Sequence, residues 1–272
     1  MKRVLTVAGS DCSGGAGIQA DLKTFSAHGV FGMSVITSVV AENTSRVISF
    51  QDVTPDMISD QIDAVFEDIE VDAVKVGMLS CAATMRAVAR KLEEYQPKWV
   101  VTDPVMYAKN GAPLMDPAST DTLVSDVLPR SDVVTPNIPE AERIAGIGIK
   151  TLDDMKRAAE SIREMGPRYV IVKGGHSSGD AVDVLLGDAG FQFFSSERID
   201  TKNTHGTGCT YSSAIASNLA LGLTVERAVS RAKSYVTGAI RRAITIGRGY
   251  GPTNHFFDMY VNGLREETTD YE

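Results

Sequence analysis

The fold of this 272-residue chain is decided by one stretch, Asn203-Thr204-His205-Gly206-Thr207-Gly208-Cys209-Thr210-Tyr211-Ser212-Ser213, which leads into the small-residue run 214–221. Gly206 and Gly208 allow a tight turn in which several amide N–H groups point the same way. A helix that begins near Gly208 adds unpaired N–H groups and the positive end of its dipole. The stretch therefore predicts an anion site, and phosphate is the usual anion at such a place.

Cys209 falls in the first turn of that predicted helix. A thiol at this position is expected to have a pKa below the free value of roughly 8.5. It can accept the proton of a substrate hydroxyl or orient that hydroxyl, whereas a nucleophilic role would also need a base such as His205 nearby. These residues leave one alternative open, which is a buried structural cysteine in a glycine-containing loop.

Composition is typical of a globular protein and argues against some classes of partner. Hydrophobic residues make up 43% of the chain and the formal net charge is −8, with no cluster of Lys and Arg. This balance argues against a nucleic-acid binder. No apolar run approaches the roughly 18 residues that a membrane span needs. The expected partners are small molecules, and a phosphorylated ligand must be held by local dipoles and a few placed cations.

Cysteine usage and the start of the chain predict a cytoplasmic location. The three cysteines (Cys12, Cys81 and Cys209) include no C-x-x-C pair. Such a sparse, odd number is typical of a reducing compartment. Residues 1–3 lead directly into a short apolar run, so no signal peptide is expected.

Short apolar runs alternate with amphipathic segments along the chain. Strands are predicted over residues 4–8, 33–40, 73–78, 99–102, 132–135 and 169–173, a hairpin over 181–195, and helices over 18–28, 55–69, 82–95, 117–128, 151–165 and 224–246. This alternation indicates one α/β domain over residues 1–266, with a central, mostly parallel sheet and helices on both faces. Residues 267–272 are expected to form a frayed tail.

A glycine-rich loop, residues 9–17 (GSDCSGGAG), follows the first predicted strand. Its spacing does not fit the dinucleotide pattern G-x-G-x-x-G, which argues against a dehydrogenase. Gly15 stands where a P-loop requires lysine, so a P-loop is excluded as well. The loop can line a ligand, as glycine-rich turns after strands often do, or serve as a structural turn.

Polar residues recur directly after the predicted strands, and they are Asp11, Glu42, Asp103, Asn137 and Lys173. In open α/β sheets ligands bind at the carboxyl ends of the strands, so five such ends predict one shared site. A solvated loop carboxylate at Glu42 and a helix N-cap at Asn137 are the alternative interpretations. The loop over residues 107–115 can cover this site.

The chemistry of these positions suits phosphoryl transfer. Asp103, Asn137 and Glu140 can hold Mg²⁺, largely through water, while phosphates take the remaining coordination positions. Lys173, at the end of a buried strand, needs an anion to offset its burial and supplies positive charge. Residues 206–209 supply the anion hole. Phosphoryl transfer depends mainly on positioning and charge stabilisation, so these parts together predict it.

Four motifs together resemble the hydroxymethylpyrimidine and phosphomethylpyrimidine kinases of thiamine biosynthesis, a family of the ribokinase superfamily. The motifs are residues 9–21 (GSDCSGGAGIQAD), 135–142 (TPNIPEAE), 172–176 (VKGGH) and 204–210 (THGTGCT). The likeness runs from Lys2 to about Tyr260. It implies a ribokinase-like fold, ATP with Mg²⁺ as cofactors, and a homodimer.

The resemblance also implies two reactions and a set of site residues. The 5-hydroxymethyl group of 4-amino-5-hydroxymethyl-2-methylpyrimidine is phosphorylated first, and the monophosphate is then converted to the pyrophosphate. Catalysis is assigned to Cys209 with Gly206, Thr207 and Gly208, where most of the superfamily has an aspartate base. The remaining assignments are substrate binding by Gly9, Asp21, Val40, Glu42, Met78 and Val105, ATP binding by Asn137, Lys173, Thr204 and Lys233, and metal binding by Asp103 and Glu140.

One residue departs from the family pattern. Glu42 stands where these kinases commonly have Gln, and an ionised carboxylate accepts hydrogen bonds without donating any. A protonated partner, either the carboxyl group or the aminopyrimidine ring, would satisfy both contacts. A pyridoxal kinase of the same subgroup is therefore the alternative function, and a catalytically idle nucleotide-binding regulator is a more distant one.

Overall fold

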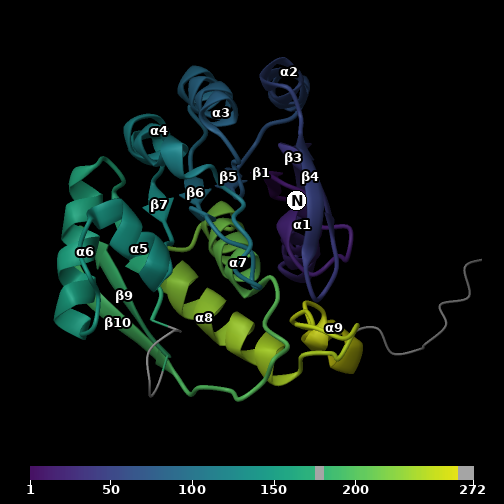
Figure 1. Cartoon of the computed structure of the whole chain (residues 1–272), viewed down its shortest axis with the longest axis vertical. Helices are drawn as coiled ribbons and strands as arrows, with labels where there is room; N and C mark the ends of the chain where they lie inside the picture. Colours follow the sequence, from purple (N-terminus) through teal and green to yellow (C-terminus); the bar gives the residue numbers. More distant parts are fainter. Residues whose placement is uncertain (175–180, 263–272) are drawn as a thin grey trace, which may run out of the picture.

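A computed structural model describes residues 1–174 and 181–262 (Figure 1). An eight-stranded sheet runs through the centre in the order β10-β9-β8-β7-β6-β5-β1-β2. All neighbouring pairs from β8 to β2 are parallel, and β9 and β10 add an antiparallel hairpin at one edge. The predicted α/β fold with a mostly parallel sheet is confirmed. The predicted frayed tail over 267–272 and the last two residues of the 172–176 motif lie outside the described residues.

The strands of this sheet are short and apolar. Their bounds are β1 Arg3–Ala8, β2 Phe31–Ile36, β5 Ala73–Val76, β6 Val100–Thr102, β7 Val133–Val134, β8 Tyr169–Val172, β9 Ala181–Gly187 and β10 Gly190–Ser196. Every residue of β5 to β8 is buried. Parallel strands covered on both faces read as continuous apolar runs, which is why the sequence predicts them well.

Helices cover both faces of the sheet (Figure 1). The longer ones are α1 Gly17–Ala27, α2 Pro55–Phe66, α3 Ala82–Tyr95, α5 Ile138–Ala145, α6 Leu152–Glu164, α7 Thr207–Ala220 and α8 Val225–Arg241, and α9 Phe257–Asn262 follows. One hydrophobic cluster joins the sheet to α2, α3, α5 and α6. A second joins it to α1, α7 and α8. Each of these longer helices therefore buries its apolar stripe against one of two cores.

The predicted strand over 33–40 is wrong in one respect, because the chain leaves the main sheet at Thr37. There the Thr37 N–H donates to the Ala8 carbonyl at 2.9 Å and the hydroxyl donates to the Met78 carbonyl at 2.8 Å. β3 Ser38–Glu42 then pairs with β4 Val47–Asp52 in a separate antiparallel sheet. β4 is almost wholly exposed, so it has no apolar pattern that predicts a strand.

Two helix predictions also need correction. Residues 117–130 form short 3₁₀, α and π turns, including α4 Thr120–Thr122, instead of one helix. Pro129 has no N–H with which to continue a regular pattern. Helix α8 ends at Arg241 and not near residue 246, because the Asn254 N–H takes the Ala239 carbonyl that residue 243 would use.

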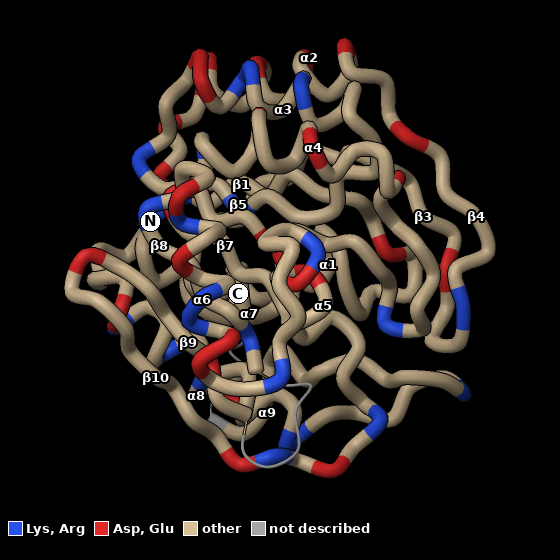
Figure 2. The backbone as a smooth tube through the Cα atoms, turned by 60° about the vertical axis from the view of Figure 1, so that its left-hand side comes forward, with Lys and Arg blue, Asp and Glu red and all other residues tan. Residues whose placement is uncertain are grey.

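Charge is dispersed over the molecule. Acidic and basic residues are interspersed along the backbone in the view of Figure 2 and form no single basic face there. Among the described residues, no helix combines the length and apolarity needed to cross a membrane.

Candidate active site

A cavity of about 700 Å³ opens where the parallel strands end. Its wall includes Gly9 after β1, Asp103 after β6, Asn137 after β7 and Lys173 after β8. Asn137 and Lys173 lie side by side through a parallel bridge that extends β7 and β8. Of the five polar residues predicted to converge, Glu42, Asp103, Asn137 and Lys173 line this cavity, whereas Asp11 lies outside its wall.

The first turn of α7 forms one wall of this cavity. Gly206 caps the helix with φ of +74°, a conformation that strains any residue with a Cβ. A Cβ there would also lie only 1.8 Å from the carbonyl oxygen of Gly15, so the two loops can touch only because residue 206 is glycine. Residues 206–209 all line the cavity, and the unpaired N–H groups of a helix start favour an anion there.

Gly208 keeps space open beside a buried ion pair. A Cβ on Gly208 would lie 3.2 Å from Asp103 Oδ2 and 3.6 Å from Lys173 Nζ. Lys173 Nζ donates to Asp103 Oδ1 at 2.7 Å, and Thr135 Oγ1 donates to the same oxygen at 3.1 Å. A lysine, a carboxylate and a helix N-terminus thus meet at one point, which suits a phosphate chain carrying a metal ion.

Asn137 and Glu140 form a reciprocal cap at the start of α5. Asn137 Oδ1 accepts from the Glu140 N–H at 3.0 Å, and Glu140 Oε2 accepts from the Asn137 N–H at 2.8 Å. The capping interpretation is therefore confirmed. Burial raises the pKa of Glu140 to about 7, although the Lys173 ammonium pulls it down.

The same residues fit Mg²⁺. Asp103 and Glu140 are both buried beside the Lys173 ammonium, and the Asp103 charge adds to the rise in the pKa of Glu140. All the available donors are oxygens, and Mg²⁺ is usually held by one or two carboxylates together with substrate phosphates. A cation arriving with a nucleotide would complete the charge balance of this group.

Cys209 lines the cavity as predicted, but the expected fall in its pKa is wrong. Burial raises the pKa of the Cys209 thiol to about 12, against the lowering effect of the Lys75 ammonium. Lys75 Nζ donates to Asp21 Oδ2 at 2.9 Å, so the Asp21 carboxylate offsets much of that positive charge. The thiol therefore keeps its proton near neutral pH.

Asp21 is absent from the cavity wall, where the resemblance places it. It is fully buried and accepts from Thr6 Oγ1 at 2.6 Å, Lys75 Nζ at 2.9 Å and Ser213 Oγ at 2.7 Å. It therefore lies behind the wall and anchors Lys75, which does line the cavity. Sequence reasoning missed Lys75, and its signal was a lone lysine within the buried strand β5.

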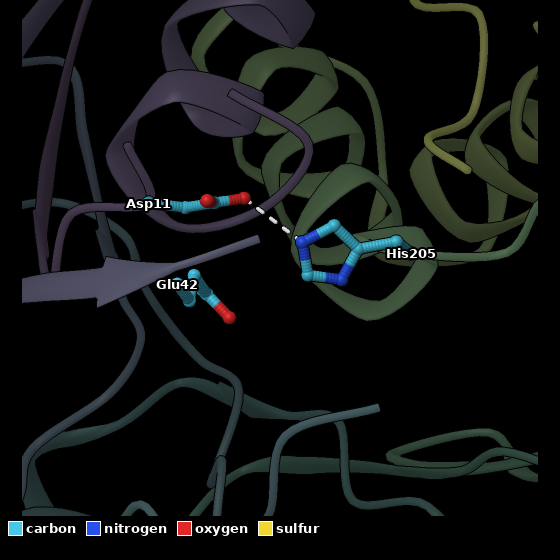
Figure 3. A group of neighbouring side chains, drawn as sticks. All are labelled: Asp11, Glu42 and His205. Carbon is cyan, nitrogen blue, oxygen red and sulfur yellow. Dashed lines mark hydrogen bonds and ion pairs between the residues drawn. The ribbon is translucent and has the colours of Figure 1, made fainter. Parts of the chain in front are cut away.

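Asp11 links the glycine-rich loop to the loop before α7. Its carboxylate accepts from the backbone N–H groups of Ser13, Gly15 and Ala16 at 2.7 to 2.9 Å, and it contacts His205 Nε2 at 2.9 Å (Figure 3). Burial alone would raise the pKa of Asp11, but the His205 contact and the backbone donors hold it well below its usual range. This contact holds the two glycine loops together.

Glu42 lies beside this pair at the end of β3 (Figure 3). Asp11, Glu42 and His205 each offer a ligand atom within 4.8 Å of the others, a grouping that a metal ion can use. The Asp11 carboxylate, however, already has four hydrogen-bond partners within the protein. Its main effect on Glu42 is therefore the repulsion between the two carboxylate charges. Burial raises the pKa of Glu42 to about 7, and the Asp11 charge adds to this effect. The neutral form of Glu42 is therefore accessible near neutral pH.

The match to known sequences decides the family. The profile of phosphomethylpyrimidine kinase matches residues 11–254. The chain belongs to the phosphomethylpyrimidine kinase family. It is 47% identical over 256 residues to the hydroxymethylpyrimidine/phosphomethylpyrimidine kinase of Bacillus subtilis, covering 93% of this chain and 94% of that relative. It is also 53% identical over 253 residues, 93% of this chain, to the thiamine biosynthesis bifunctional protein ThiED of Geobacter sulfurreducens, of which it spans about half (52%).

Solved structures agree with this kinase family and its ribokinase-like fold. Phosphomethylpyrimidine kinase from Clostridium difficile is 48% identical and matches with a TM-score of 0.79 over 88% of this chain and 100% of that one. Bacillus subtilis pyridoxal kinase in an ADP complex is 40% identical and matches with a TM-score of 0.88 over 94% of this chain and 98% of that one.

In this kinase the other predicted positions share the same cavity. Val40, Met78 and Val105 line it together with Gly9 and Glu42. Thr204 and Lys233 line it as well, and Lys233 Nζ lies 2.9 Å from Asp183 Oδ2. Of the site residues predicted from the sequence, Asp11 and Asp21 lie outside the wall.

Proposed function

We propose that this kinase transfers the γ-phosphoryl group of ATP to the hydroxymethyl group of 4-amino-5-hydroxymethyl-2-methylpyrimidine, and then transfers a second one to the resulting monophosphate. One observation carries the proposal: the anion site at residues 206–209 lines the same cavity as Glu42 and the apolar residues Val40, Met78 and Val105. The names of the relatives support the same pair of reactions.

The nucleotide phosphates are assigned to the end of the cavity formed by α7 and Lys173. The helix N-terminus and the lysine stabilise negative charge on the transferred group, in a site that is already ordered. Asn137, Thr204 and Lys233 complete this end. Mg²⁺, held by Asp103 and Glu140, would supply further neutralisation of the phosphate charge.

The acceptor ring is assigned to the end of the cavity that contains Glu42. In its neutral form the Glu42 carboxyl donates one hydrogen bond and accepts another. It can therefore donate to a ring nitrogen and accept from the 4-amino group, as a glutamine amide would. The raised pKa of Glu42 makes this neutral form available near neutral pH.

Cys209 is assigned to the acceptor hydroxyl. With its pKa raised to about 12, the side chain is a neutral thiol that orients the hydroxyl by hydrogen bonding. The hydroxyl proton then passes late, as the new P–O bond forms, to an oxygen of the transferred phosphoryl group, while the bond to the ADP oxygen breaks and ADP leaves; the loose transition state of phosphoryl transfer needs little base catalysis. The monophosphate acceptor is already largely deprotonated at pH 7, so the second transfer needs no base.

Pyridoxal phosphorylation is the second candidate, favoured by the close structural likeness to Bacillus subtilis pyridoxal kinase. Both rings carry a hydroxymethyl group. A non-catalytic, nucleotide-binding regulator is the most distant candidate, and turnover of either acceptor contradicts it.

Three further expectations rest on the resemblance and the composition. They are a homodimer, a cytoplasmic location, and a single domain over residues 1–266. Sedimentation of the purified chain tests the first, cell fractionation tests the second, and a single cooperative unfolding transition supports the third.

A mass-resolved time course with Mg-ATP and the pyrimidine alcohol tests the function. The expected result is a monophosphate that rises first and a pyrophosphate that follows, with two ADP formed for each alcohol consumed. Bound ATP without either product would contradict the proposal.

A further inference from the structure

Four lysines among the described residues line the cavity, and three of them are neutralised by a carboxylate. The pairs are Lys75 with Asp21 at 2.9 Å, Lys173 with Asp103 at 2.7 Å and Lys233 with Asp183 at 2.9 Å. The fourth is Lys109, which has no ion-pair partner within the described part of the chain. It is therefore the lysine of this wall whose charge is left for a ligand.

Lys109 sits on a tight turn between β6 and residue 117. Tyr107 and Pro113 form an antiparallel bridge, and the Ala108 N–H donates to the Ala112 carbonyl at 2.8 Å. Gly111 makes the turn with φ of +84°. The backbone on both sides of Lys109 is thus held in place by its own hydrogen bonds.

The turn belongs to the acceptor end of the cavity. Asn110 Nδ2 donates to the Ser45 carbonyl at 3.3 Å, which joins the tip of the turn to the connection between β3 and β4. β3 is the strand that ends at Glu42. Lys109 therefore lies near the β3–β4 unit that carries Glu42, on the side of the cavity assigned to the ring.

The surroundings of Lys109 favour an anion. Lys109 is an exposed residue that lines the cavity, and partial desolvation by the nearby protein lowers the pKa of its ammonium, with no carboxylate opposing that effect. An ammonium that has lost water without gaining a counter-charge is stabilised by any anion that enters. A phosphate group offers three acceptor oxygens to such a cation.

The second transfer brings in an anion of this kind. The monophosphate acceptor carries a charge of about −1.5 to −2 at pH 7 and must approach the γ-phosphate of ATP, which is also negative. One of its oxygens forms a bond to the γ-phosphorus while the bond from that phosphorus to the ADP oxygen breaks, and ADP leaves. Lys173 serves the transferred group at the nucleotide end, and among the lysines of the described cavity wall Lys109 alone adds a charge that no carboxylate already shares.

We propose that Lys109 binds the phosphate of the monophosphate acceptor and so makes the second transfer possible. The inference rests on the proposed function and extends it, because it assigns a subsite that only the phosphorylated acceptor uses. The alcohol brings no charge to this subsite in the first transfer.

Separate kinetics for the two acceptors test the subsite. Lys109→Met is expected to raise KM for the monophosphate about 10–100-fold, which corresponds to the loss of one charge-assisted hydrogen bond. With the alcohol as acceptor, kcat/KM is expected to stay within about threefold. Lys109→Arg, which keeps the charge, should recover most of the second activity. Lys98→Met is the matched control, because Lys98 is exposed and lies just before β6, at the opposite end of that strand.

Binding provides a readout that does not depend on turnover. Calorimetry should show weaker monophosphate binding to Lys109→Met and unchanged ADP binding. Equal losses with both acceptors, or a loss of ADP affinity, would overturn the inference and place Lys109 on the nucleotide. An unchanged KM for the monophosphate would overturn it as well. A wild-type enzyme that forms no product from either acceptor would instead contradict the proposed function.

Discussion

The two ends of the cavity are built in different ways. At the nucleotide end, buried ion pairs and a helix start are locked by close packing, as Gly206 and Gly208 show. At the acceptor end, the wall comes from the small β3–β4 sheet and the 107–115 turn, where Tyr107 and Lys109 are exposed. The charges at the nucleotide end are thus already in place before the transition state forms. The acceptor end is more open, and it must admit two acceptors, the alcohol and its monophosphate.

The first prediction tests whether the buried ion pair of Lys75 with Asp21 stabilises the fold behind the cavity wall. Asp21→Asn leaves the Lys75 ammonium without its partner at a position that is fully buried. Removing one partner of such a pair is expected to lower the free energy of unfolding by about 3–5 kcal/mol. Chemical denaturation measures the change.

Asp153→Asn is the control for this variant, because Asp153 is exposed and its pair with Lys156 is a surface pair. The double variant Asp21→Asn/Lys75→Met should recover part of the loss, since no charge is then left alone. A stable Asp21→Asn enzyme with a raised KM for the acceptor would contradict the buried structural role. It would show instead that Asp21 contributes to acceptor binding.

The second prediction fills the anion site without changing its charges. Gly208 has helical geometry and tolerates a Cβ in its backbone, but that Cβ would press on Asp103 Oδ2 at 3.2 Å. Gly208→Ala is expected to lower kcat/KM for Mg-ATP by about 10²–10³-fold and leave the melting temperature unchanged or higher. Steady-state kinetics and thermal unfolding measure both. Gly148→Ala is the matched control, because a Cβ there meets nothing within 4 Å.

The third prediction separates the two transfers at Cys209. Cys209→Ala removes the thiol that orients the hydroxyl, so first-transfer turnover is expected to fall by about 10²-fold or more with little change in ATP binding. The second transfer, whose acceptor is already deprotonated, should lose far less. Single-turnover rates with each acceptor measure the difference, and Cys81→Ala serves as the control. A Cys209→Ala variant that keeps most of its first-transfer turnover would show that Cys209 contributes only to packing.

The fourth prediction concerns the acceptor end and has the smallest effect. The pKa of Glu42 is raised to about 7, so its neutral form dominates below that pH and disappears above it. For the pyrimidine alcohol, kcat/KM should therefore fall about tenfold per unit once the pH exceeds about 7. Glu42→Gln should remove this decline. A rate that rises through the same range would show that the ionised carboxylate is the productive form.

The sequence predicted the nucleotide end well because its parts are local. Glycine spacing, the cap at Asn137 and polar residues after apolar strands are short-range signals, and the structure brings them together as expected. The pKa of Cys209 was predicted with the wrong sign, since burial and the neutralising pair of Lys75 with Asp21 depend on segments far apart in the chain.

The acceptor end was harder to predict for a related reason. β4 is exposed and carries no periodic pattern, so the small sheet that holds Glu42 was not expected. The contact of Asp11 with His205 joins residues 194 positions apart, and no local pattern signals it. The same holds for Lys109, whose significance depends on which other lysines are already paired.

The central claim is that this cavity selects the aminopyrimidine alcohol. The most direct test is the ratio of kcat/KM for that alcohol to kcat/KM for pyridoxal, measured with Mg-ATP on wild-type enzyme and on Glu42→Gln. The account predicts a ratio well above one for the wild type at or below neutral pH, with the Glu42→Gln variant keeping that preference at higher pH. A wild-type ratio below one would contradict the account and assign the cavity to pyridoxal.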